Sequence, residues 1–260
     1  MRTTRLARAL TAALVVAAAA AGCTTAGVAA QDAPRPTRSA SDPQAAHLTW
    51  EQLTPDTLVP RLSESMLAAR SLTWTTRTTG PTGPVENVVD VDMVRSNNRV
   101  SATIPGGAVE VRSVDGRRFV RAPATHGKYF DDTKGDAGLP VPAVSVDPVR
   151  PVRALYGAVI AVRIAGPRTD VNGVPAQPYD VVVATSRLTD GLGDLGGGVP
   201  REQLPATVTL GFWVDQQNRL VKATSNIAGT PVEMTFTSWG ADAGITAPTE
   251  DQLTNVLSGT

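Results

Sequence analysis

Few side chains in this 260-residue sequence could carry out covalent or acid–base chemistry. The sequence contains two histidines, His47 and His126, and one cysteine, Cys23. A zinc site needs several His or Cys ligands, and a catalytic thiol or hydroxyl needs a positioned histidine beside it. His47 lies at the end of a polar stretch, and no nucleophile-elbow pattern accompanies His126. We therefore expect no enzyme activity, no cofactor and no metal site.

Two other patterns could bind a charged ligand. Residues 191–196, GLGDLG, match the G-x-G-x-x-G form of a phosphate-binding loop, but glycines and prolines follow where a helix should begin. The aspartates of residues 131–136 lack the alternate-residue spacing of a calcium loop. Asp90 and Asp92 share one face of a strand. We expect this to be the solvated outer face of the sheet, where two aspartates need no bound cation. We interpret the glycine segment as a mobile loop and the aspartates as surface features.

The beginning of the chain has the layout of an export signal that ends at the cysteine. Three arginines precede an apolar run over residues 10–21, which is too short to span a membrane. The tetrapeptide Ala20–Cys23 is similar to a bacterial lipobox, with alanine where leucine is usual. We predict a lipoprotein signal peptide over residues 1–22 and acylation of Cys23 with palmitate-type chains. The alternative is a secreted protein that is cleaved at an Ala-x-Ala site and keeps a free thiol.

A low-complexity segment follows the cysteine. Residues 23–48 are rich in Ala, Thr, Ser, Pro and Gln and too poor in large apolar residues to build a core. A flexible chain of about 25 residues spans on the order of 25 to 30 Å. We predict a disordered tether over residues 23–48 that holds a single domain, residues 49–260, on the extracytoplasmic face of the cell membrane.

The composition excludes one class of partner and favours strands. Removal of residues 1–22 takes away three arginines and no acid, which leaves 21 basic against 24 acidic residues. This balance argues against nucleic acid as a partner. The 23 Gly and 20 Pro, with few aromatics and abundant Val and Thr, favour strands and turns over long helices.

Apolar and polar residues alternate in many short runs, as in strands with one buried face. Strands are expected over residues 72–79, 85–94, 99–104, 108–114, 117–121, 179–185, 208–214, 220–227 and 232–236. Turn-forming residues such as Asp215–Asn218 and Ala228–Pro231 separate neighbouring runs. Consecutive strands should therefore pair antiparallel, with one face of the sheet apolar and the other polar.

Two helices are expected to cover the apolar face. Thr54 is a suitable N-cap, Pro55 suits the first helical position, and Asp56 lies at the positive end of the helix dipole. Apolar residues then recur at helical spacing up to about Arg70. A second short helix is expected over residues 148–161. These elements predict a mainly antiparallel β fold with a few helices, of the α+β class.

The order of these features resembles a known family. Lipobox, tether, helix and antiparallel strands precede Val171–Pro175 (VNGVP), Gly211–Asp215 (GFWVD), Arg219–Val221 (RLV) and Trp239–Gly240 before Ile245–Pro248. This order is similar to that of the actinobacterial LppX/LprAFG lipoproteins and the wider LolA-like superfamily, over nearly the whole chain from Cys23. The resemblance implies a curved half-barrel with helices over its concave face and a cavity for the acyl chains of lipids or lipoglycans. It carries over no catalytic residue.

The apolar residues of the expected concave face are the candidate ligand-binding residues. They are Val89, Val91, Met93, Val109, Val111, Val181, Val183, Leu210, Phe212, Met234 and Phe236. A site for acyl chains needs an apolar, poorly hydrated hollow and little else. We expect a carrier or chaperone for a lipid or lipoglycan in the cell envelope. The alternative is a half-barrel filled by its own side chains that senses or docks onto an envelope protein.

Overall fold

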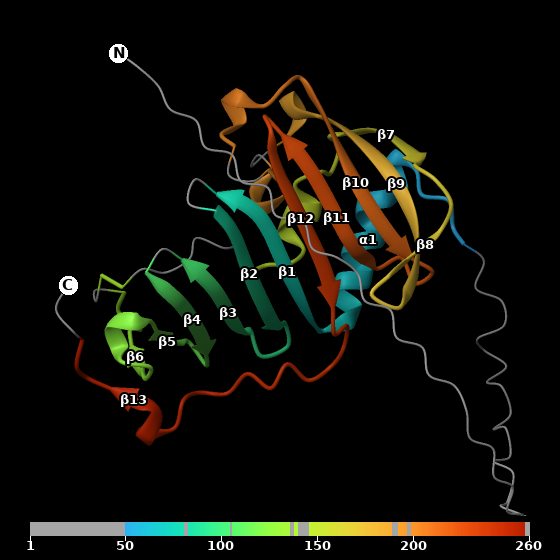
Figure 1. Ribbon diagram of the computed structural model, residues 1–260. Helices are drawn as coiled ribbons and strands as arrows, with labels where there is room; N and C mark the ends of the chain where they lie inside the picture. Colours follow the sequence, from blue (N-terminus) through green and yellow to red (C-terminus); the bar gives the residue numbers. More distant parts are fainter. Residues whose placement is uncertain are drawn as a thin grey trace, which may run out of the picture. The chain divides into compact units, whose positions relative to one another are not determined.

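The described part of the chain comprises residues 50–80, 83–104, 106–135, 138–139, 146–188, 192–196 and 199–257 in a computed structural model (Figure 1). These residues belong to one compact unit, His47–Thr260. Cys23, the predicted signal peptide of residues 1–22 and the predicted tether of residues 23–48 lie outside the described residues and stay predictions. No helix within the described ranges is long and apolar enough to cross a membrane.

One sheet of 13 strands forms most of this unit, and its strands pair antiparallel except at one edge. The strand order is β13-β6-β5-β4-β3-β2-β1-β12-β11-β10-β9-β7, and β8 pairs with β9. The bounds are β1 Ser71–Gly80, β2 Gly83–Asp92, β3 Asn97–Ile104, β4 Gly107–Val114, β5 Arg117–Arg121, β6 Tyr129–Asp131, β7 Val159–Ile164, β8 Thr169–Val171, β9 Val174–Ala184, β10 Thr207–Asp215, β11 Leu220–Ile227, β12 Thr230–Thr237 and β13 Leu253–Thr254. Pairing of β1 with β12 joins an N-terminal meander to a C-terminal one.

The predicted strands form where the alternation of side chains placed them. In β10, Val208, Leu210 and Phe212 are buried while Thr209 is exposed. The polar turn that follows is held by Asp215, whose Oδ1 accepts hydrogen bonds from the backbone N–H groups of Gln217 and Arg219. The predicted antiparallel β class is therefore confirmed.

The first predicted helix is confirmed as α1, Pro55–Ala69. Oγ1 of the N-cap Thr54 accepts a hydrogen bond from the Thr57 N–H at 3.3 Å, and the Thr57 hydroxyl accepts one from the Thr54 N–H at 2.9 Å. The helix ends at Arg70, which has a left-handed backbone conformation. These reciprocal contacts satisfy two backbone donors that a helix start otherwise leaves unpaired.

The second helix is shorter than predicted. α2 covers only Arg150–Arg153, and the chain then turns into β7. Gly157 has a φ of 71°, which a continuing helix does not allow. The apolar run that begins at Val159 instead pairs with β9. The prediction of a helix throughout residues 148–161 was wrong because β-branched residues at a sheet edge gained strand partners.

Five short 3₁₀ turns lie in the part of the chain that the structure describes. They are η2 Pro123–Thr125, η3 Thr185–Arg187, η4 Gly193–Gly196, η5 Arg201–Gln203 and η6 Glu250–Gln252. The glycine segment predicted to be a mobile loop contains η4, and Leu192 before it and Leu195 within it are buried in the main core. The mobility of the segment stays a prediction.

The sheet has two differently covered faces. The inner face packs against α1, α2 and η4, and together they form the main apolar core. Figure 1 shows α1 behind β10, β11 and β12. On the outer face, residues 241–254, which we call the C-terminal strap, run from the end of β12 to β13, which pairs parallel with β6. Ile245 of the strap is buried, as are Val114, Phe119 and Tyr129 of β4–β6.

Candidate functional site

The 11 residues predicted for the concave face share the inner face of the sheet. Ten of them are at most 5% exposed and belong to the main core. Met93, the remaining one, is partly buried and packs against the same core. Strand register brings them together, since Leu210 pairs with Val181 and Val208 pairs with Val183 across β10 and β9. Their role in ligand binding stays a prediction.

The helix α1 supplies much of the cover of this face. Its residues Leu58, Val59, Leu62 and Met66 are buried in the main core. Val152 of α2 is buried in the same core. Apolar packing of this kind has no fixed direction, so methylene groups of a ligand could replace part of it without loss of specific bonds.

A hollow of about 340 Å³ opens at one end of this face, beside the last turn of α1. Val91 and Met93 line it from the sheet, and Leu67, Val146 and Val149 line it from α1 and from the segment before and at the start of α2. Leu67 and Val146 are exposed, so large apolar groups surround an opening to solvent. The volume lies near the lower end of the roughly 300–1,000 Å³ typical of small-molecule sites.

Polar groups line the rest of the hollow. They belong to Asp92, Ser96, Asn97, Asn98, Asp147 and Arg153. Asp92 Oδ1 accepts hydrogen bonds from the N–H groups of Val94 and Arg95, and Asp147 Oδ1 accepts one from the N–H of Val149. Both carboxylates therefore hold local turns. Arg153 is exposed, and no acid of the described residues forms an ion pair with its guanidinium.

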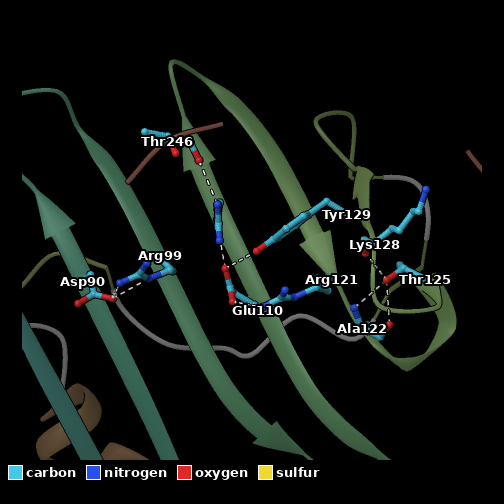
Figure 2. A network of polar contacts seen from close by, with 10 residues as sticks. Asp90, Arg99, Glu110, Arg121, Ala122, Thr125, Lys128, Tyr129 and Thr246 are labelled. Carbon is cyan, nitrogen blue, oxygen red and sulfur yellow. Dashed lines mark hydrogen bonds and ion pairs between the residues drawn. The ribbon is translucent and has the colours of Figure 1, made fainter. Parts of the chain in front are cut away.

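The outer face of β4–β6 carries a cluster of charged and polar side chains around Glu110, as Figure 2 shows. Glu110 accepts hydrogen bonds from the Tyr129 hydroxyl at 2.5 Å, from Arg112 Nε at 2.7 Å and from Arg121 at 2.5 Å. The Tyr129 ring lies 4.7 Å from the Arg112 guanidinium and 4.9 Å from that of Arg121. Arg112 also donates to the backbone oxygen of Thr246 at 3.4 Å, which ties the strap to this cluster.

This outer cluster shifts two pKa values. Burial raises the pKa of Tyr129 to about 12, and the hydrogen bond to Glu110 adds to the shift. Burial also acts to raise the pKa of Glu110, but hydrogen bonds from Tyr129 and Arg112, with the charges of Arg112 and Arg121, bring it below its ordinary value. Glu110 is thus held in its ionised form, with its charge balanced by the two arginines. This is a structural role rather than that of a general acid.

The aspartates considered as cation ligands are paired with arginines. Asp90 accepts hydrogen bonds from the Thr73 hydroxyl at 2.6 Å and from Arg99 Nε at 2.8 Å, and it is buried. Asp132 is likewise buried and bonded to Arg118 at 2.6 Å. The interpretation of Asp90 and Asp132 as solvated surface groups was wrong, because arginines on neighbouring strands cover them. Asp131 is exposed as interpreted, and Asp136 lies outside the described residues. Within the described ranges, no three His, Cys, Asp or Glu side chains form a cluster that could hold a metal.

Several residues of the site were missed from the sequence. Trp74 and Leu72 lie on the inner face of β1, and the alternation within residues 72–79 would have located them. Leu67 is exposed on α1, and Val146 and Val149 precede or begin a very short helix. Leu67 belongs to the apolar stripe predicted for α1 but is exposed, and no periodic pattern marks Val146 or Val149, so only the tertiary structure places the three around one hollow.

Comparison with known proteins shows the fold. No family model and no curated protein matches the chain. Among solved structures, LprF from Mycobacterium bovis has a TM-score of 0.52 at 16% identity, over 75% of this chain and 96% of LprF. The lipoprotein LppX from Mycobacterium tuberculosis gives 0.48 at 15% identity, over 73% of this chain and 98% of LppX. The MucA/MucB complex of Pseudomonas aeruginosa gives 0.35 at 17% identity, over 76% and 59%. The fold predicted from the resemblance is therefore confirmed by its likeness to that of LprF.

Proposed function

We propose that this protein is a lipoprotein of the cell envelope that binds the acyl chains of a lipid or lipoglycan and acts as its carrier or chaperone. The observation that carries the proposal is the hollow beside α1, whose apolar lining continues into the core of the inner face. The fold shared with LprF supports it. The proposal is for a binding protein without catalytic activity or cofactor.

The energetics of chain burial are sufficient for such a role. Burial of about ten methylene groups contributes on the order of 8 kcal/mol, which corresponds to a dissociation constant near the micromolar range before the cost of immobilising the chain. The hollow is small for a lipid of two or three chains. In the proposal, α1 shifts to make further room, because its contacts with the sheet are mainly apolar and, among the described residues, only Ser65 Oγ, which donates to the backbone oxygen of Asn218 at 2.7 Å, must give up a directional bond.

Anchoring follows from the sequence in the same proposal. Two or more acyl chains on Cys23 would hold the protein on the membrane, whereas one chain is a marginal anchor. The Cys23→Ser variant should leave the membrane fraction and lose the mass of the attached chains, which fractionation and intact mass spectrometry measure. A wild-type protein that is found entirely in the culture medium without added mass would contradict the anchor and support the plain secreted form.

Lipid binding is best tested on Cys23→Ser protein, because any lipid mass then comes from a bound ligand. Native mass spectrometry followed by organic extraction should show a co-purifying lipid that is lost on denaturation. Met93→Glu places a charge at the hollow and should reduce the bound fraction more than about 10-fold. Val94→Glu is the matched control, since Val94 is the exposed neighbour and is not among the residues that line the hollow.

A protein that stays free of lipid after incubation with envelope lipids would contradict the carrier role. The alternative is then an interaction module. It is favoured by β7, the terminal strand of the sheet path among the described residues, which carries exposed Ile160 and Ile164 and follows exposed Tyr156. Such an edge can add an extended segment of a partner protein. In that alternative, Ile164→Lys should abolish crosslinking of this protein to its envelope partner and leave lipid binding unchanged.

A further inference from the structure

Two neighbouring polar atoms on the inner face have no hydrogen-bond partner. The buried unpartnered side-chain atoms of the described residues are Ser63 Oγ, Trp74 Nε1, Thr76 Oγ1 and Trp239 Nε1. Trp74 is 1% exposed and Thr76 is 7% exposed, and they lie two residues apart on the same face of β1. Buried polar groups are nearly always paired, so a pair of unused donors in one wall needs an explanation.

The two donors lie among the predicted ligand-binding residues. Trp74 is opposite Phe236 on β12 and opposite Val89 on β2. Thr76 is opposite Met234 on β12 and opposite Asn87 on β2. Since directly opposite residues share a face of the sheet, the indole N–H and the hydroxyl belong to the wall that an acyl chain on this face would contact.

One residue that lines the hollow is a near neighbour of these donors on the inner face. Val91, which lines the hollow, pairs with Leu72, and Val89 pairs with Trp74. Val91 is therefore the diagonal neighbour of Trp74, at about 7–8 Å between Cα atoms. A chain that entered at Val91 and followed the inner face of β1 would reach Trp74 first and Thr76 next.

The next inward-facing residue of β1, Thr78, has a hydroxyl group for which the fold does provide a hydrogen-bond acceptor. Thr78 follows Thr76 on the inner face of β1, and its hydroxyl donates to the backbone oxygen of Pro231 at 3.0 Å. Ser225, on β11, likewise donates to the backbone oxygen of Leu195 at 2.5 Å. Structural hydroxyls on this face thus find backbone acceptors, whereas that of Thr76 does not.

We infer that Trp74 and Thr76 form an internal hydrogen-bonding subsite for the carbonyl oxygen of an acyl ester or amide. An indole N–H only donates and a threonine hydroxyl can donate, while a carbonyl oxygen accepts two hydrogen bonds. A ligand without a carbonyl among its chains leaves both donors unpaired in a buried wall, where an unpaired donor costs most. The subsite therefore selects acyl-ester lipids over ethers and plain hydrocarbons. This inference rests on the proposed function.

The test compares two glycerolipids with the same chains and head group, dioleoylglycerol with ester links and its dialkyl ether analogue. Transfer of each from neutral phosphatidylcholine vesicles to Cys23→Ser protein is measured by native mass spectrometry. Wild-type protein should prefer the diester by roughly 10-fold or more, because the ether leaves two buried donors unpaired. Thr76→Val and Trp74→Phe should each reduce that preference, and together bring it within about 2-fold.

Two controls separate ligand recognition from folding. Thr76→Ser keeps the hydroxyl and should keep the preference, and Thr78→Val removes a hydroxyl that already has a partner and should also keep it. In ligand-free protein, Thr76→Val should leave the melting temperature unchanged or raise it, since it removes an unpaired buried donor. A fall in melting temperature as large as that of Thr78→Val would show that the hydroxyl is satisfied within the protein and would overturn the inference.

The lipid measurements distinguish the two failures. Equal transfer of diester and diether to wild-type protein overturns the subsite and leaves the carrier role intact. Transfer of neither lipid, together with a lipid-free protein after incubation with envelope lipids, overturns the carrier role itself. Loss of diether binding in Thr76→Val would also count against the subsite, because the ether has no carbonyl to recognise.

Discussion

On the outer face of the sheet, Glu110 is surrounded by donors from Tyr129, Arg112 and Arg121, whereas on the inner face the buried Trp74 and Thr76 have no partner. The outer cluster depends on directional, charge-assisted contacts that fix three strands against one another. The inner face depends on apolar contacts, which have no direction and can be exchanged for those of a ligand. The difference indicates that one face stabilises the sheet and the other is suited to open.

The segments that cover the two faces, the C-terminal strap and α1, also differ in how they are attached to the sheet. The C-terminal strap is attached by β13, whose Leu253 pairs with Tyr129, and by the contact of Arg112 with Thr246. The cover formed by α1 is fixed by its caps and four buried apolar side chains. We therefore propose that α1 moves when a ligand enters and that the strap does not.

The largest expected effects come from a matched pair of phenylalanines. Phe119 on the outer face is 1% exposed and Phe212 on the inner face is 0% exposed. Replacement of either by Ala should lower the free energy of unfolding by about 3–5 kcal/mol, because each leaves a cavity. Added lipid should restore part of the stability of Phe212→Ala and none of that of Phe119→Ala, as measured by urea unfolding with and without lipid. Equal restoration of both variants would remove the distinction between the faces.

Glu110→Gln should weaken the outer cluster by about 2–3 kcal/mol in unfolding free energy, because Arg112 and Arg121 lose a largely buried anion. Glu86→Gln is the control, since the Glu86 side chain is 49% exposed and its pairing with Arg77 is a surface contact. Its effect should be at most about 0.5 kcal/mol. The folded-state pKa of Glu110 is lowered, so its stabilisation is present above its unfolded pKa and is lost as the pH falls through the folded one. Lipid binding at neutral pH should be unchanged in both variants.

Tyr129→Phe should cost about 1.5–2 kcal/mol of unfolding free energy at neutral pH, because a buried hydroxyl donor to a carboxylate is lost. The folded-state pKa of Tyr129 is raised to about 12, above its ordinary value of about 10. Its contribution is therefore fully present below pH 10 and is lost as the pH rises through 12. The difference between wild type and variant should shrink over that interval in chemical unfolding series. A constant difference would show that the hydroxyl does not titrate in the cluster.

Thr54→Ala gives the smallest change in stability and the most direct test of the moving cover. Loss of the N-cap of α1 should lower the unfolding free energy by about 1 kcal/mol. It should also speed lipid exchange with vesicles, because the start of α1 is loosened without any change in the sheet. Thr54→Ser keeps the capping oxygen and should keep the wild-type exchange rate. An unchanged rate in Thr54→Ala would indicate that the helix start does not limit entry.

Local sequence patterns determined most of the strands, the turns and the first helix, but not β6, β7 or β13. Period-two alternation located β10 and the inner position of Phe212, because neighbouring side chains on a strand must face opposite ways. Thr54 and Pro55 located the start of α1, because the capping contacts involve residues only three positions apart. The same alternation placed all the predicted ligand-binding residues on one face.

The tertiary structure decided which distant segments meet. The pairing of β1 with β12, the contact of Arg112 with Thr246 of the strap and the burial of Asp90 beside Arg99 all depend on neighbours that periodicity does not specify. The position of the hollow likewise depends on the tertiary structure, since Leu67, Val91 and Val146 come from three separate segments that share no sequence pattern. A one-dimensional repeat records which side of an element is apolar, but the partner of that side is set by three-dimensional packing.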